Sequence, residues 1–173
     1  MQAVPYRSLP PEPGRTALLQ ALLDALREFF RDNLVSVVLF GSVARGEAGE
    51  LSDVDLLIVC EDLPGSRWKR YALFNQAISR LETLLEELGR QHYYPEFRPI
   101  LKTRSEAEIH TPIYLDMVED ARILYDREQF FAGVLAGLKQ RLKELGARRV
   151  FMGDGSWYWD LKPDYRFGEI FEI

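Results

Sequence analysis

Two short apolar segments and the twelve residues between them constrain the fold of this chain most strongly. The first, LVSVVLF at residues 34–40, ends at Gly41-Ser42, and the second, DVDLLIVC at residues 53–60, begins with Asp53-Val54-Asp55. Both are rich in β-branched and aliphatic residues and shorter than a typical helix, so each predicts a buried β-strand. The glycine-containing link between them has room for at most one helical turn, over residues 42–45.

The two aspartates at the start of the second strand are expected to share one site. Side chains alternate along extended backbone, so Asp53 and Asp55 project from one face, about 7 Å apart. Each carboxylate raises the pKa of the other unless a hard, oxygen-binding cation neutralises both. The pattern therefore favours magnesium, which is commonly held by one or two carboxylates together with substrate phosphates.

The Gly-Ser turn is suited to bind the phosphates of such a ligand. Gly41 and Gly46 have the spacing of a P-loop, but Glu47 stands where that loop needs lysine, and the sequence contains no Gly-x-Gly-x-x-Gly motif. We therefore expect the strand to end at Gly41 and Ser42 to cap a short helix, whose free backbone N–H groups face an anion. The glycine lets a phosphate approach the main chain, and the serine hydroxyl can add a hydrogen bond.

Hydrophobic periodicity predicts the remaining helices and strands, and the composition divides the chain into three segments. An extended lead-in covers residues 1–14, which hold four of the nine prolines. The main domain is expected over residues 15–149 and an aromatic tail over residues 150–173. Helices are expected at 15–32, 66–89, 112–119 and 127–145, and further strands at 122–125 and at 95–102, the last at a sheet edge or bulge because of its prolines.

The tail is too aromatic to remain exposed. It contains Trp157, Tyr158, Trp159, Tyr165, Phe167 and Phe171. These rings must be buried either on the tail's own domain or against another subunit, which leaves a homo-oligomer open.

The composition of the chain limits the kinds of ligand and partner that it is expected to bind. A formal charge of −5 and a pI near 5.2 argue against strong attraction to long nucleic acid, so a handled nucleotide is expected to be small. The chain has too few cysteines and histidines for a structural zinc site, namely Cys60, His92 and His110. Cys60 is expected to be a small, buried hydrophobic residue. With one cysteine, and neither a signal peptide nor an apolar run of membrane-spanning length, we expect a soluble cytoplasmic protein.

Gly41-Ser42, ten intervening residues and Asp53-Val54-Asp55 together resemble the signature of the DNA polymerase β nucleotidyltransferase superfamily. The chain is most similar to the minimal nucleotidyltransferases (MNT-type), whose usual partner is a helical HEPN protein. The resemblance implies an α/β (α+β) fold with a mixed β-sheet and helices mainly on one side. It also implies two Mg²⁺ ions and transfer of a nucleoside monophosphate from an NTP to a hydroxyl acceptor.

The resemblance also suggests roles for individual residues. Asp53 and Asp55 would bridge the metals, and Glu96 would be the third carboxylate, acting as a metal ligand or general base, with Asp116 and Asp120 as substitutes. Gly41 and Ser42 would hold the phosphates. Arg45 would neutralise the leaving pyrophosphate, with Lys102 or Arg98 on the third strand as alternatives for that role.

Two functions follow as hypotheses. The first is a magnesium-dependent nucleotidyltransferase whose acceptor is a partner protein, such as a HEPN-type toxin, or a small hydroxyl compound. The second is a non-catalytic antitoxin or nucleotide-binding module that blocks its partner stoichiometrically. The retained pair of mutually repelling acids favours the enzyme, because a blocker has no need of them.

Overall fold

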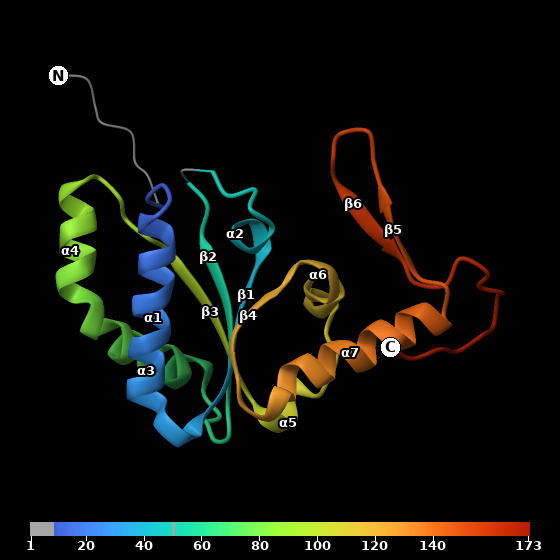
Figure 1. Ribbon diagram of the computed structural model, residues 1–173. Helices are drawn as coiled ribbons and strands as arrows, with labels where there is room; N and C mark the ends of the chain where they lie inside the picture. Colours follow the sequence, from blue (N-terminus) through green and yellow to red (C-terminus); the bar gives the residue numbers. More distant parts are fainter. Residues whose placement is uncertain (1–8, 50) are drawn as a thin grey trace.

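A four-stranded mixed sheet forms the centre of the computed structural model, which describes residues 9–49 and 51–173 (Figure 1). The strands are β1 (Leu34–Phe40), β2 (Val54–Cys60), β3 (Phe97–Thr103) and β4 (Arg122–Asp126), in the spatial order β3-β2-β1-β4. β1 pairs antiparallel with β2 and β4, whereas β2 and β3 are parallel. The expected strands are therefore present, and the third lies at a sheet edge, as its prolines predicted.

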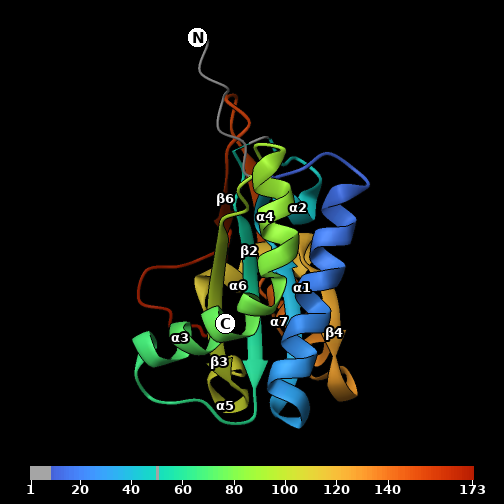
Figure 2. The same ribbon diagram turned by 90° about the vertical axis from the view of Figure 1, so that its left-hand side faces the viewer.

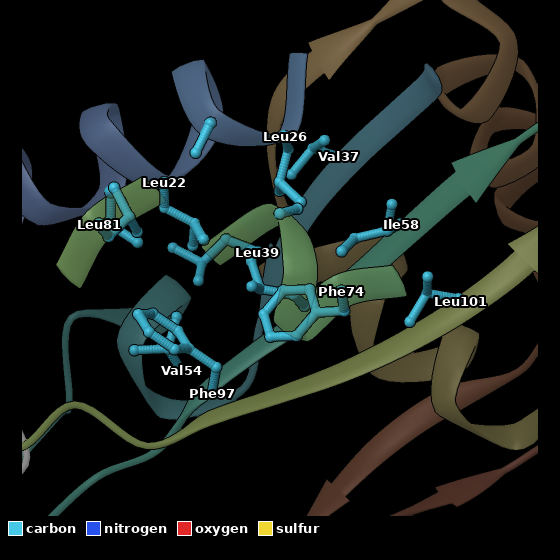
Figure 3. Packing of buried hydrophobic residues seen from close by; sticks show 14 of the residues in the cluster. Leu22, Leu26, Val37, Leu39, Val54, Ile58, Phe74, Leu81, Phe97 and Leu101 are labelled. Atoms are coloured by element: carbon cyan, nitrogen blue, oxygen red, sulfur yellow. The ribbon is translucent and has the colours of Figure 1, made fainter. Parts of the chain in front are cut away.

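Helices cover one face of this sheet and bury its larger hydrophobic cluster. They are α1 (Gly14–Phe30), α3 (Arg67–Ile78) and α4 (Glu82–Arg90), which lie together on one side of the strands (Figure 2). Figure 3 shows Leu22 and Leu26 of α1 and Phe74 of α3 packed against strand residues such as Leu39 and Ile58. Leu9, within the expected lead-in, is also buried in this cluster, while residues 1–8 of that segment lie outside the described residues.

Helices also cover the opposite face, which corrects one detail of the expected fold. α5 (Arg104–Ala107), α6 (Pro112–Asp120) and α7 (Phe130–Glu144) lie there over a second cluster that includes Val35, Val38 and Leu57 (Figure 1). The reason is in the strands themselves: β1 and β2 are apolar at nearly every position, and a strand of that kind is buried on both faces. The α/β fold with a mixed sheet is confirmed, and its helices form two layers.

Short connections complete the architecture. The expected helix over 66–89 is divided by a 3₁₀ turn, η2 (Ser79–Leu81). The helix expected from residue 127 is preceded by another 3₁₀ turn, η3 (Arg127–Gln129). A third 3₁₀ turn, η1 (Arg31–Asn33), ends α1, and α2 (Gly41–Arg45) links β1 to β2. In the described ranges 9–49 and 51–173, no helix has the length and apolar character needed to cross a bilayer.

A hairpin that the sequence did not predict follows α7, and the aromatic residues after α7 are only partly buried, contrary to expectation, since Tyr158, Tyr165 and Phe167 are exposed. β5 (Arg148–Phe151) and β6 (Trp157–Asp160) form a separate two-stranded antiparallel sheet, which stands beside α6 and beyond α7 (Figure 1). β5 spans residue 149, where the main domain was expected to end.

Candidate active site

The two halves of the sequence motif meet at one end of the sheet. Gly41 follows β1 directly with a φ of +71°, and the register of the β1–β2 pair sets Phe40 opposite Asp55. A Cβ atom added to Gly41 would lie 2.4 Å from Asp55 Oδ2, closer than any side-chain contact allows. Glycine is therefore required here twice, for its backbone conformation and for the close approach of the carboxylate.

The short helix after Gly41 begins one residue earlier than expected. α2 starts at Gly41 with Phe40 as its N-cap, so the expectation that Ser42 caps it is wrong, and the described chain provides no side-chain cap there. The positive φ of Gly41 turns the backbone into the helix at once, which leaves Ser42 inside the first turn. At the other end, the backbone N–H of Gly46 donates to the carbonyl of Ser42 and closes the turn.

Asp55 is the more perturbed of the two motif aspartates. Burial raises the pKa of its carboxyl, and repulsion by Asp53 raises it further, while Arg98 and Arg45 act in the opposite direction. Asp53 lies just before the start of β2, with a side chain 21% exposed. The two acids thus act on each other, and the charge on Asp55 is unfavourable without a neighbouring cation.

Arg98 supplies positive charge at the motif in this structure. It stands opposite Asp55 in the parallel β2–β3 register, and its Nη2 lies 2.8 Å from Asp53 Oδ2 and 3.7 Å from Glu96 Oε1. Its side chain is 59% exposed, so the pair with Asp53 is solvated and weak.

Glu96 lies near this ion pair but does not complete a three-carboxylate centre. Its carbonyl oxygen accepts from the N–H of Val54 at 2.8 Å, which fixes its backbone beside the motif, while its side chain is 54% exposed. Within residues 9–49 and 51–173, no group of three or more His, Cys, Asp or Glu side chains is arranged to hold a metal. The structure thus brings Asp53 and Asp55 together with Gly41, and leaves Glu96 at the rim.

Asp116 and Asp120, the substitutes for Glu96, are used elsewhere. Both lie on α6 and accept hydrogen bonds from the C-terminal hairpin, Asp120 from Arg149 at 2.9 Å and Asp116 from the indole N–H of Trp157 at 3.0 Å. In the described structure both aspartates are thus engaged with the hairpin, Asp120 through both carboxylate oxygens and Asp116 through Oδ1.

A cleft of about 830 Å³ extends from Asp55 along β3. Lys102 lines it further along the strand, with its Nζ 4.7 Å from the ring centroid of Tyr114. Burial lowers the pKa of this ammonium group, and Glu106 nearby partly offsets the effect. The cleft is large enough for a nucleotide or the side chain of an acceptor.

The wall of the cleft at α3 is fixed by a partly buried ion pair, in which Arg70 is largely covered and Glu106 is exposed. Arg70 donates two hydrogen bonds to Glu106, at 2.6 and 2.9 Å, and one to the carbonyl of Leu101 at 3.1 Å. These bonds, with one from the backbone N–H of Thr103, lower the pKa of Glu106 to about 2. The same arginine covers a carbonyl of β3, which protects this edge strand from pairing with another chain.

Arg45 closes the site at the end of α2. Its Nε donates to Glu47 at 2.6 Å, and its guanidinium lies 5.1 Å from the ring centroid of Trp157. Sequence reasoning included Arg45 but missed Trp157. The alternation in Trp157-Tyr158-Trp159 was the available signal, since it places two indoles on one face of a strand.

The donor chemistry of the motif fits a divalent cation. Asp53 and Asp55 are hard oxygen ligands that repel each other, and Gly41 lets the Asp55 carboxylate lie directly against the turn, where any larger residue would collide with it. Arg98, the positive group now paired with Asp53, is solvent-exposed and can move away.

Comparison with known proteins agrees with this geometry. The nucleotidyltransferase domain family matches residues 19–139, and the chain belongs to that family. A protein of Methanocaldococcus jannaschii named "Putative protein adenylyltransferase MJ1305" is 32% identical over 130 residues, which cover 74% of this chain and 83% of that protein. The chain is thus a nucleotidyltransferase with a mixed-sheet fold.

Solved structures give a looser likeness. A chain from "Crystal structure of the toxin-antitoxin with AMP-PNP" superposes with a TM-score of 0.47 at 18% identity, covering 73% of this chain and 91% of that one. A nucleotidyltransferase structure from Sulfolobus solfataricus gives a TM-score of 0.44 at 21% identity, over 67% of this chain and 86% of that one.

Proposed function

We propose that this nucleotidyltransferase is magnesium-dependent and transfers AMP from ATP to a hydroxyl group of a partner protein. The contact between Gly41 and Asp55 carries the proposal, because it joins a phosphate-binding turn to the acidic pair at a single point. The adenylyl group and the protein acceptor follow the name of the M. jannaschii relative. A HEPN-type protein with an accessible tyrosine is the partner that the sequence motif suggested.

Each residue of the motif has a distinct task in this proposal. Asp53 and Asp55 would hold the divalent cations, with Glu96 as the third oxygen donor at the rim. When bound, the metals would supply charge neutralisation and activation of the attacking hydroxyl. Gly41, Ser42 and the first N–H groups of α2 would bind the phosphates, and Arg45 would balance the charge that develops on pyrophosphate.

Arg98 has to leave Asp53 before metal can bind. In the described structure it neutralises this carboxylate, and its exposure allows another rotamer at small cost. Arg98 thus keeps the two acids compatible while the site holds no cation, and competes with metal afterwards. We expect Arg98→Ala to tighten Mg²⁺ binding, which titration calorimetry with MgATP at several Mg²⁺ concentrations measures.

A second function is favoured by one observation. The Arg98–Asp53 pair, together with the rim position of Glu96, would also suit a module that binds and blocks its partner without catalysis. Such a module would need no metal.

Label transfer distinguishes the two functions. The protein is incubated with ATP labelled at the α-phosphate, Mg²⁺ and the product of the neighbouring gene, alongside an Asp55→Asn variant. The enzyme labels the partner protein, and Asp55→Asn abolishes the label. Inhibition of the partner without labelling, equal in parent and variant, would instead support the blocking module.

A further inference from the structure

The C-terminal hairpin lies outside the region that defines the family. The family match ends at residue 139, whereas β5 and β6 occupy residues 148–160. The hairpin nevertheless lies beside α6 (Figure 1). The ring centroid of its Trp157 is 5.1 Å from the guanidinium of Arg45 at the end of α2. It therefore connects a segment beyond the family domain to the motif helix.

Two aspartates of α6 hold the hairpin in place. Asp116 Oδ1 accepts the indole N–H of Trp157 and that of Trp159, each at 3.0 Å. Asp120 accepts two hydrogen bonds from Arg149, at 2.9 and 3.3 Å, and both groups are largely buried, with 16% and 14% of their side chains exposed. Charge-assisted bonds of this kind fix orientation as well as position.

Both tryptophans donate to Asp116 and lie near Arg149, but their other contacts differ. The ring of Trp157 lies 6.1 Å from that of Phe151, and Trp159 packs against the second hydrophobic cluster. The guanidinium of Arg149 lies 5.0 Å from the ring centroid of Trp157 and 5.4 Å from that of Trp159. Trp157 alone, within the described residues, also has the guanidinium of Arg45 near its ring, at 5.1 Å. One indole is thus in contact with two cations, one from the hairpin and one from the motif helix.

Arg45 needs such a contact to keep a defined position. It is the last residue of a five-residue helix, and its ion-pair partner Glu47 is 60% exposed. A solvated pair of this kind restrains a long side chain weakly. A ring of a fixed hairpin gives the guanidinium a second, directional restraint that leaves its charge free for an anion.

We propose that Trp157 is a positioning residue of the active site, which holds Arg45 in place for the phosphates of the nucleotide. The inference rests on the proposed function, in which Arg45 faces the phosphates. It makes the hairpin a part of the nucleotide site, although the residues that define the family lie elsewhere.

The test compares the two tryptophans in the full chain. Trp157→Leu and Trp159→Leu each remove one indole donor to Asp116 and one ring near Arg149, but only the first removes the ring near Arg45. We expect Trp157→Leu to weaken MgATP binding about three- to tenfold by titration calorimetry. Trp159→Leu should keep the MgATP affinity within about twofold of the parent, although it should lower the melting temperature at least as much as Trp157→Leu, because Trp159 also packs against the second cluster.

Two further variants show whether the effect passes through Arg45. Trp157→Phe keeps an aromatic ring and lacks the indole donor, so it should restore most of the affinity. In an Arg45→Gln background, Trp157→Leu should cause no further loss, because the group that it positions is gone. The inference is overturned if both tryptophan variants weaken binding equally, or if Trp157→Leu acts as strongly without Arg45.

An NMR measurement of the contact between Arg45 and the Trp157 ring tests this inference separately from the proposed function. In the parent, the Arg45 Nε–H resonance should be shifted by the Trp157 ring current; the shift should vanish in Trp157→Leu and persist in Trp159→Leu. A parent that shows this shift but does not bind MgATP would contradict the proposed function and the nucleotide role together. A parent that binds MgATP without the shift would contradict the positioning role alone.

Discussion

Gly41 is the residue on which the site depends most. Its backbone has a positive φ and its Cα faces Asp55, so a side chain meets two separate obstacles. Gly46, at the other end of α2, shares only the first: its φ is +75°, and among the described residues no atom lies within 4 Å of an added Cβ. Substitutions at the two glycines therefore distinguish the effect of backbone strain from the effect of a steric clash with Asp55.

We expect Gly41→Ala and Gly46→Ala each to lower the free energy of unfolding by about 1–2 kcal/mol, because alanine disfavours a positive φ. Only Gly41→Ala should also abolish MgATP binding, since its methyl group displaces the Asp55 carboxylate. Urea unfolding and titration calorimetry on both variants measure the two effects. Normal MgATP affinity in Gly41→Ala would show that the glycine does not shape the site.

The raised pKa of Asp55 predicts a stability that depends on pH. The folded protein binds the Asp55 proton more tightly than the unfolded chain does, so this residue lowers stability as pH rises from its ordinary pKa, 3.8, through the raised value. Asp55→Asn removes that cost. We expect the variant to be more stable than the parent at pH 7, with the gain disappearing below the ordinary pKa, measured by urea unfolding at both pH values.

In Asp55→Asn, the gain in stability at pH 7 would accompany a loss of activity. Charged groups kept for function commonly lower the stability of the fold. Asp126→Asn is the structural control. Asp126 accepts hydrogen bonds from Ser36 and from two backbone N–H groups at the start of α7, so Asp126→Asn should destabilise the fold. Equal destabilisation by both amides would contradict the view that Asp55 is kept for function.

At the scale of elements, the hairpin is attached to the domain through few groups. Asp116 accepts from both indoles and, at 3.4 Å, from Arg149, and Asp120 accepts from Arg149 at 2.9 Å. We expect Asp116→Ala to release the indoles and expose the hairpin, so that amide hydrogen exchange rises over residues 148–160 while β1 and β2 remain protected. Asp160→Ala, which removes only an exposed pair with Arg148, should leave that exchange near the parent value.

Unchanged exchange in Asp116→Ala would mean that packing, and not these hydrogen bonds, fixes the hairpin. The apolar side chains of the hairpin that reach the second cluster, such as Trp159, would then be sufficient.

The elements that sequence reasoning placed well are those with strong local patterns. LVSVVLF gave β1 with its observed bounds, and the prolines of residues 95–99 placed β3 at an edge. The break at η2 was missed because Ser79-Arg80-Leu81 contains no glycine or proline. Leu81 and Leu88 are both buried, but they are seven residues apart and would share one face of a continuous helix, so the hydrophobic periodicity gives no sign of the break.

For the whole molecule, the candidate site was predictable in part. Gly41, Asp53 and Asp55 are close in sequence, and strand alternation is enough to bring them together. The Arg98–Asp53 pair depends on the parallel pairing of β2 with β3, and the Trp157–Arg45 contact joins residues 112 positions apart. Contacts of that kind are set by the packing of layers, which periodicity does not specify.

Titration calorimetry of ATP with Mg²⁺ on the parent and on Asp53→Ala/Asp55→Ala tests the nucleotide site itself. We expect the parent to bind MgATP and to lose most of its affinity without Mg²⁺, and we expect the double variant to remain folded but not to bind. Equal affinity in parent and variant, or binding that is indifferent to Mg²⁺, would contradict the claim that these two aspartates and Gly41 form the nucleotide site.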